Sequence, residues 1–311
     1  MRGIFYNSKK ALCSIWESGK MCYDALIKST EFSIDYTEND ILDMSYDFLV
    51  INYHHAVNNW IKEDMIKEYN KPSFCIVTEV TFGENPILLS APFFTNYLVL
   101  DPTINETNRL YAFGRPLESC ITTESCITNS NLDSTVPIIG SFGFATAGKE
   151  WNMLINCVQN EYDDAIIHFN IPKGSYVTDE MQNSTITSIQ EHFDQTVTKP
   201  GISLKLTFDN LSKEELLQFC RKNTINCFFY YRQHIFSAGL AAVTDQAISS
   251  GKPLLVTGDC TFRHIHKYID YYPNISIKCA IEETAKGVEQ MKNDWSSSNF
   301  LIKFEKILLA S

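Results

Sequence analysis

One stretch, residues 136–151, restricts what this chain can fold into more than any other part of the sequence. It predicts a buried strand over 136–141, a turn that contains Gly143 and Gly148, and a helix that opens at Lys149 or Glu150. A strand that enters a helix through a glycine-containing turn is typical of α/β folds. Glycine is also favoured at any strand-to-helix corner, so the pattern alone does not define a site.

The same turn has the chemistry of an anion site. Backbone N–H groups and the positive end of a helix come together beside Lys149, and proteins hold phosphate in this way. We therefore expect a nucleotide site that uses Ser141, Gly143 and Lys149. Because the stretch begins in the middle of the chain, a unit with a fold of its own should precede it.

Strands and helices alternate along both halves of the chain, which favours parallel sheets with crossover helices. In the first half we expect strands over 3–7, 32–36, 47–52, 73–80 and 97–100, and helices over 19–29 and 57–69. In the second half we expect strands over 138–141, 164–170, 202–207, 227–230 and 253–257. The helices expected there span 150–160, 179–197, 212–222, 239–250, 261–269, 282–292 and 299–309.

The length of 311 residues suits two domains. Residues 118–135 are rich in Ser, Thr, Asn and acidic side chains without apolar periodicity, which indicates a linker. We expect an α/β protein with two Rossmann-like domains, 1–117 and 136–294, that face each other across a cleft. Residues 295–311 should form a C-terminal helix that crosses back to the first domain.

Composition excludes several classes of function. The formal net charge of −11 argues against a nucleic-acid groove, which needs clustered Lys and Arg. No apolar run is long enough to span a bilayer, although peripheral contact with a membrane stays open. The N-terminal residues predict a strand and no signal peptide, so we expect a cytoplasmic protein. The ten scattered cysteines predict reduced, mostly buried thiols and no structural zinc.

Residues 228–257 carry a second pattern: a strand, a loop, a helix near Gly239, then Ser-Gly-Lys-Pro and another strand. This pattern resembles the donor half of GT-B glycosyltransferases, in which the donor helix typically reads Glu-Gly-x-Gly-x-x-x-x-Glu-Ala-x-x-x-Gly-x-Pro. Ser237 stands at the first Glu position, Gly239 in the turn and Asp245 at the second Glu position. Three further residues keep the spacing, namely Ala247, Gly251 and Pro253.

The resemblance implies a glycosyltransferase that moves a sugar from a nucleotide sugar to a glycan or lipid-linked acceptor. The donor would lie on the second domain and the acceptor on the first. The sequence has no Asp-x-Asp, the motif of the metal-dependent GT-A type, so we expect neither a metal nor any other cofactor beside the nucleotide sugar.

The sequence departs from the family pattern at two positions. Ser237 replaces the first acid, and no arginine stands in the turn after Gly143. Arg232 or Arg263 would have to help Lys149 with the diphosphate, since a lysine is a single point charge. Asp245 suits ribose hydroxyls as acceptor, as acids do in other nucleotide sites.

Each of these residues also has a purely structural interpretation. Ser237 fits equally well as a helix N-cap, Asp245 as an ordinary helix-face acid, and Arg263 as an exposed helix end.

A transferase also needs a base for the acceptor hydroxyl, with a pKa near working pH or raised by burial. His54 follows an expected strand, Glu17 lies between a strand and a helix, and Glu79 ends another strand. We rank them in this order.

Two alternatives stay open. One is a sugar-nucleotide epimerase or hydrolase of the same fold, and the other is a catalytically inactive nucleotide- or glycan-binding module. The Walker A, His-Glu-x-x-His and Gly-x-Ser-x-Gly motifs are absent from the sequence, and the dinucleotide fingerprint is incomplete.

Overall fold

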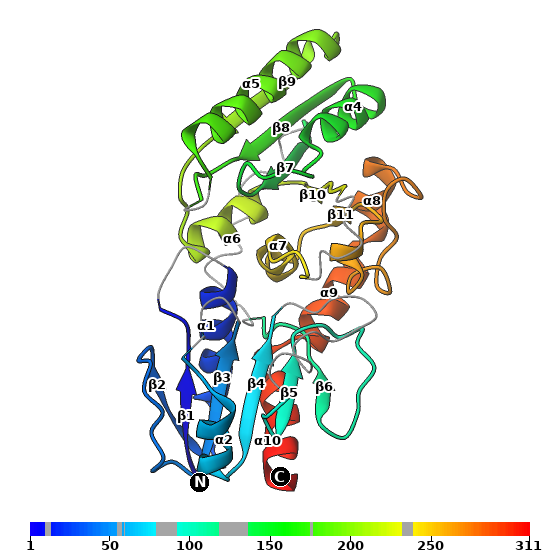
Figure 1. Ribbon diagram of the computed structural model, residues 1–311. Coiled ribbons are helices and arrows are strands. Elements are labelled where there is room, and N and C mark those ends of the chain that lie inside the picture. The colour runs from blue at the N-terminus through cyan, green and yellow to red at the C-terminus, as the bar shows by residue number, and fades with distance from the viewer. Residues whose placement is uncertain are drawn as a thin grey trace. The chain divides into compact units, whose positions relative to one another are not determined.

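The computed structural model describes residues 1–9, 14–54, 58, 60–78, 92–117, 136–174, 177–231 and 239–311. The chain divides into two compact units (Figure 1). The first unit comprises Met1–Glu118, Ile235–Leu240 and Asn293–Ser311, and the second comprises Ser119–His234 and Ala241–Lys292. The expected linker, 118–135, lies outside the described residues, as do Glu79, Arg232 and Ser237.

The first unit contains a six-stranded parallel sheet in the order β2-β1-β3-β4-β5-β6. The strands are β1 (Arg2–Tyr6), β2 (Ser33–Thr37), β3 (Phe48–Tyr53), β4 (Ser73–Val77), β5 (Asn96–Val99) and β6 (Leu110–Ala112). All six residues of β3 are buried, as expected of a central parallel strand that is covered on both faces. The order reverses between β1 and β3, where crossovers leave in opposite directions.

Helices cover both faces of this sheet, and each face has its own core. They are α1 (Ser14–Leu26), α2 (Glu63–Tyr69) and α10 (Ser297–Ala310). Side chains alternate along a strand, so Leu49 and Ile51 pack with Ile66 of α2, whereas Phe48 packs with α1 and with Phe304 of α10. The last helix of the chain therefore completes the core of the first unit.

The second unit contains a five-stranded parallel sheet in the order β11-β10-β7-β8-β9. Its strands are β7 (Ile138–Phe142), β8 (Asp164–Asn170), β9 (Gly201–Thr207), β10 (Ile225–Phe228) and β11 (Leu254–Val256). Numbered from β7, this is the Rossmann order 3-2-1-4-5, with its reversal between β7 and β10. The expected α/β class with two Rossmann-like sheets is confirmed.

Within the described ranges, seven helical segments accompany this second sheet. They are α4 (Trp151–Glu161), α5 (Asp179–Thr196), α6 (Lys213–Lys222), α7 (Val243–Ser250), the 3-10 turn η2 (Cys260–Phe262), α8 (Ile277–Glu283) and α9 (Ala285–Asp294). Helices α4 and α5 pack on each other, as do α6 and α7. Leu154 and Ile155 of α4 and Ile189 of α5 enter the main core together with Ile139 and Ile167 of the sheet.

Two expected helices begin later than the sequence predicts. Helix α2 begins at Glu63 instead of residue 57, because the Asn58 side chain accepts a hydrogen bond from the His54 amide at 2.8 Å and forms a local turn. Helix α7 begins at Val243 instead of residue 239. The amide of Ala241 donates to the carbonyl of Thr261 at 3.1 Å, so the chain just before Val243 is held by a tertiary bond.

The helix expected over 261–269 is wrong. Only η2 forms there, and the chain then continues in turns. The Asp259 side chain caps the Thr261 amide, and later turns close through i→i+3 bonds such as Tyr268 to Ile265.

Two further differences concern the C-terminal helices and a short strand. The helix expected over 282–292 is two helices that divide at Thr284. The side chain of Thr284 donates to Ala280 and accepts from Leu254, which fixes the break. Strand β6, only three residues long, was not expected.

Candidate functional site

The turn between β7 and α4 is built around Gly143. Its φ of +137° is a conformation that side chains disfavour, and its amide donates to Asn170 of β8 at 3.0 Å. A Cβ at this position would lie 2.2 Å from the Nζ of Lys149. The absence of a side chain therefore leaves room for the lysine ammonium group directly against the backbone.

Lys149 connects this turn to the end of β10. Its Nζ donates to the carbonyl of Phe144 at 2.7 Å and lies 5.7 Å from the ring centroids of both Trp151 and Tyr230. Lys149 and Tyr230 also form a backbone bridge. The ammonium group is thus placed at the reversal between β7 and β10, the position where Rossmann-like sheets bind ligands.

The start of α7 lies beside the same glycine. A Cβ on Gly143 would approach the Cγ1 of Val243, the first residue of α7, to 3.5 Å. Asp245 lies in the first turn of this helix and is buried. The structure therefore brings Gly143 and Lys149 together with the helix that carries Asp245.

Arg263 and Ser141 lie in the same part of the second unit, and Gly239 lies close to α7 in the chain. Arg263 follows η2, whose Phe262 ring lies 4.9 Å from the Tyr230 ring, with the two planes tilted by 55°. Its Nη1 donates to the carbonyl of Cys260. Ser141 is buried near the end of β7, and Gly239, partly exposed, lies four residues before α7. The roles of these residues stay predictions.

In the first unit, the two described base candidates differ in environment. His54 is partly buried directly after β3, where its amide donates to Asn58. Glu17 is exposed in the first turn of α1. Both follow the carboxyl end of a strand, as the sequence predicts, and their catalytic roles remain untested.

Two buried asparagines form a network that the sequence analysis missed. Asn52, within β3, donates to Asn7 at 2.7 Å and to the carbonyl of Ile15 at 2.8 Å. Asn7, directly after β1, donates to the carbonyl of Trp16 at 3.1 Å. The network fixes the first turn of α1 against the sheet. The signal in the sequence was that an asparagine, Asn7 or Asn52, ends each of the two expected strands.

Three polar atoms at the carboxyl ends of the central strands have no hydrogen-bond partner in the described part of the chain: Ser8 Oγ, Asn52 Oδ1 and Thr78 Oγ1. Ser8 follows β1, Asn52 lies near the end of β3 and Thr78 directly follows β4. All three side chains are buried. Buried polar atoms rarely stay unsatisfied. Water or a polar ligand therefore suits this edge of the first sheet.

Within the described ranges, no group of three or more His, Cys, Asp or Glu side chains is arranged to hold a metal ion. In the same ranges, no helix combines the length and apolar character that a bilayer crossing demands. The seven described cysteines are free thiols, and five of them are buried.

The two parallel sheets and their strand orders define an α/β protein with the GT-B fold, in agreement with the resemblance seen in the sequence. No family model matches the chain, and no curated protein sequence is significantly similar to it.

Several solved structures match over almost the whole chain. HepE from Anabaena, solved in complex with UDP, has a TM-score of 0.64 at 9% identity and covers 100% of both chains. A glycosyltransferase from Rickettsia africae has a TM-score of 0.63 at 11% identity, with 99% of this chain and 97% of that chain covered. Trehalose-6-phosphate synthase OtsA has a TM-score of 0.67 at 8% identity, with 100% and 99% covered. At these identities the shared property is the fold.

Proposed function

We propose that the protein is a glycosyltransferase that moves a sugar from a nucleotide sugar to a glycan or lipid-linked acceptor. The observation that carries the proposal is the position of Lys149. Its ammonium group lies against Gly143, at the strand-order reversal of a sheet whose fold is shared with glycosyltransferases. HepE has been solved with UDP and with UDP-glucose, which supports a uridine diphosphate sugar as the first donor to test.

In this proposal the diphosphate lies on the turn after β7, near Lys149 and the start of α7. An ammonium group can donate three hydrogen bonds, so a phosphate contact does not require loss of the bond to Phe144. Asp245 would accept from ribose hydroxyls, and Arg263 would add the second positive charge. Charge on the departing diphosphate would be stabilised by these groups without a metal ion.

The acceptor would bind at the carboxyl edge of the first sheet. The unsatisfied Ser8, Asn52 and Thr78 atoms support this assignment, since a saccharide hydroxyl both donates and accepts. His54, or one of Glu17 and Glu79, would take the proton of the acceptor hydroxyl. The acceptor oxygen then bonds to the anomeric carbon as the sugar–phosphate bond breaks and the nucleoside diphosphate leaves.

The test begins with a thermal-shift screen against UDP-, GDP-, CMP- and dTDP-sugars. Lys149→Ala and Arg263→Ala should each weaken binding of the nucleoside diphosphate by about 1–3 kcal/mol, because each removes a charged donor. Lys199→Ala is a matched control, since Lys199 also donates to a backbone carbonyl, at 2.8 Å, but lies beyond the far end of α4. Unchanged affinity in both test variants would remove the site.

Turnover experiments then separate the alternatives. His54→Ala should lower transfer and spare donor affinity if His54 is the base. Consumption of donor without acceptor would favour an epimerase or hydrolase. Binding of nucleoside diphosphate without turnover of any donor would favour an inactive binding module, for which Ser237 at the first acid position is the specific observation.

A further inference from the structure

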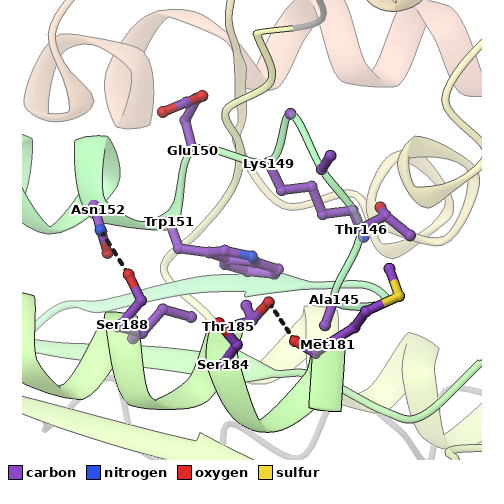
Figure 2. Close-up of a pocket in the computed structure, with 13 residues that line it drawn as sticks. Ala145, Thr146, Lys149, Glu150, Trp151, Asn152, Met181, Ser184, Thr185 and Ser188 are labelled. Carbon is purple, nitrogen blue, oxygen red and sulfur yellow. Dashed lines mark hydrogen bonds between the residues drawn. The ribbon is translucent and has the colours of Figure 1, made fainter. Parts of the chain in front are cut away.

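A hollow of about 400 Å³ lies in the second unit between the β7–α4 turn and α5 (Figure 2). One wall is the turn from Ala145 to Asn152, and the other is the face of α5 that carries Ser184, Thr185 and Ser188. The volume is at the low end of the range of about 300–1,000 Å³ seen for small-molecule sites. Lys149 lines both this hollow and the nucleotide site proposed above, whereas Gly143, Asp245 and Arg263 do not line the hollow, so the two sites are neighbours that share one residue.

The lining of the hollow combines polar and apolar side chains. Hydroxyl groups come from four residues and an amide from a fifth: Thr146, Ser184, Thr185, Ser188 and Asn152. Ala145, Trp151 and Ile189, all buried, supply apolar surface. The two charged lining residues, Lys149 and Glu150, have opposite signs, so the lining has no net formal charge.

Two polar atoms of lining side chains lack the partner that they need. The Nε1–H of Trp151 donates to no acceptor in the described ranges, and this side chain is 7% exposed. The Oδ1 of Asn152 likewise accepts no hydrogen bond there, while its Nδ2 makes only a long 3.5 Å contact with Ser188. An unsatisfied buried donor and acceptor beside one hollow indicate a ligand that offers both groups.

We propose that this hollow binds a neutral saccharide of one or two rings. A saccharide hydroxyl can accept from Trp151 Nε1 and donate to Asn152 Oδ1, while the C–H faces of the ring lie against the apolar lining residues. The serine and threonine hydroxyls of α5 would contact the remaining hydroxyl groups. An anionic ligand fits poorly, because the negative charge of Glu150 balances the positive charge of Lys149 in the lining.

The test uses the full chain, titrated with D-glucose and with maltose and followed by saturation-transfer NMR. Ser188→Tyr should abolish the signal by filling the hollow. Thr187→Tyr, the next residue on α5, is exposed and does not line the hollow, so it should leave binding unchanged. Trp151→Phe keeps an aromatic ring but removes the N–H donor, and should weaken binding about fivefold.

Four results would overturn the proposal: no binding of either sugar, binding that survives Ser188→Tyr, equal affinity in Trp151→Phe, or a preference for glucose 6-phosphate over glucose. Affinity for UDP is measured on the same variants and should not change in Ser188→Tyr. A loss of saccharide binding with intact UDP binding therefore separates this hollow from the proposed nucleotide site, and either assignment can fail without the other.

Discussion

At the scale of single residues, Gly143 and Lys149 depend on each other. The glycine takes a positive φ and leaves the space in which the lysine Nζ lies. The lysine in turn donates a hydrogen bond to the carbonyl of Phe144 and lies over the rings of Trp151 and Tyr230. Backbone geometry and charge placement at this turn are therefore one feature, and a side chain at residue 143 should disturb both.

Gly143→Ala should lower the free energy of unfolding by about 2–3 kcal/mol, because it adds both an unfavourable φ and a contact with Lys149. Gly251→Ala is the control. Gly251 also has a positive φ, of +72°, but only the flexible end of Lys292, at 3.4 Å, lies near its missing Cβ. That variant should cost about 1–2 kcal/mol. Urea unfolding measures both, and equal losses would contradict the role given to Lys149.

His168, on β8, should make stability depend on pH. Burial, followed by the charges of Lys205 and Lys222, lowers its pKa from 6.5 to about 4. The unfolded chain therefore binds more protons than the folded chain between these values, and stability falls as the pH falls from 6.5 to 4. The loss is on the order of 1–2 kcal/mol once solvent screening of the partly exposed ring is allowed for.

His168→Phe keeps packing against Phe219, whose ring centroid lies 4.6 Å away. Urea unfolding at several pH values should show a shallower dependence between pH 4 and 6.5 than in the parent chain. If the free energy of unfolding depends on pH as steeply as in the parent chain, His168 is not the source of that dependence.

At the scale of elements, α6 shows how local sequence sets a boundary. Ser212 accepts from the Glu215 amide at 3.3 Å, and the Glu215 carboxylate accepts from the Ser212 amide at 2.8 Å, which is a complete capping box. The helix begins where this pattern predicts. Four consecutive residues carry this signal, so the start of the helix can be predicted from local sequence.

Ser212→Ala should destabilise the second unit by about 1–2 kcal/mol, because it removes the hydroxyl that accepts from the Glu215 amide and donates to the Glu215 carboxylate. Thr178→Ala at the start of α5 removes a simple cap without a box and should cost about 0.5–1 kcal/mol. Thermal and urea unfolding compare the two variants. A larger effect at Thr178 would show that the box adds nothing to the simple cap.

Other elements depend on distant contacts and could not be predicted from sequence. The chain just before α7 is held by the bond from Ala241 to Thr261, twenty residues further along the chain. The segment after β11 forms turns because its side chains bond back to the strand, as His266 does to the carbonyl of Thr257 at 3.1 Å. Helical periodicity was present in both segments, but it does not contain these contacts with distant residues.

At the scale of the whole molecule, the C-terminal helix α10 completes the core of the first unit, which the N-terminal strands form. Phe304 of α10 is fully buried, with ring centroids 5.0 Å from Phe74, 5.6 Å from Phe32 and 6.2 Å from Phe48. The first sheet therefore lacks part of its core until residues 297–310 are in place.

Phe304→Ala should lower the free energy of unfolding of the first unit by about 3–5 kcal/mol, through lost burial and a cavity among the rings. Leu309→Ala on the same helix changes a side chain that is 65% exposed and should stay within about 0.5 kcal/mol of the parent. Hydrogen exchange of β1 and β3 amides, measured beside urea unfolding, locates the effect. Equal stability of the two variants would contradict the packing role of α10.

For this protein the sequence by itself determined the alternation of strands and helices, the α/β class and the Gly143–Lys149 turn. Each of these follows from spacing among residues that are close in the chain. The tertiary structure alone decided the strand orders, the start of α7, the asparagine network below α1 and the hollow beside α5. These depend on which distant backbone groups and side-chain faces meet, and local periodicity does not contain that information.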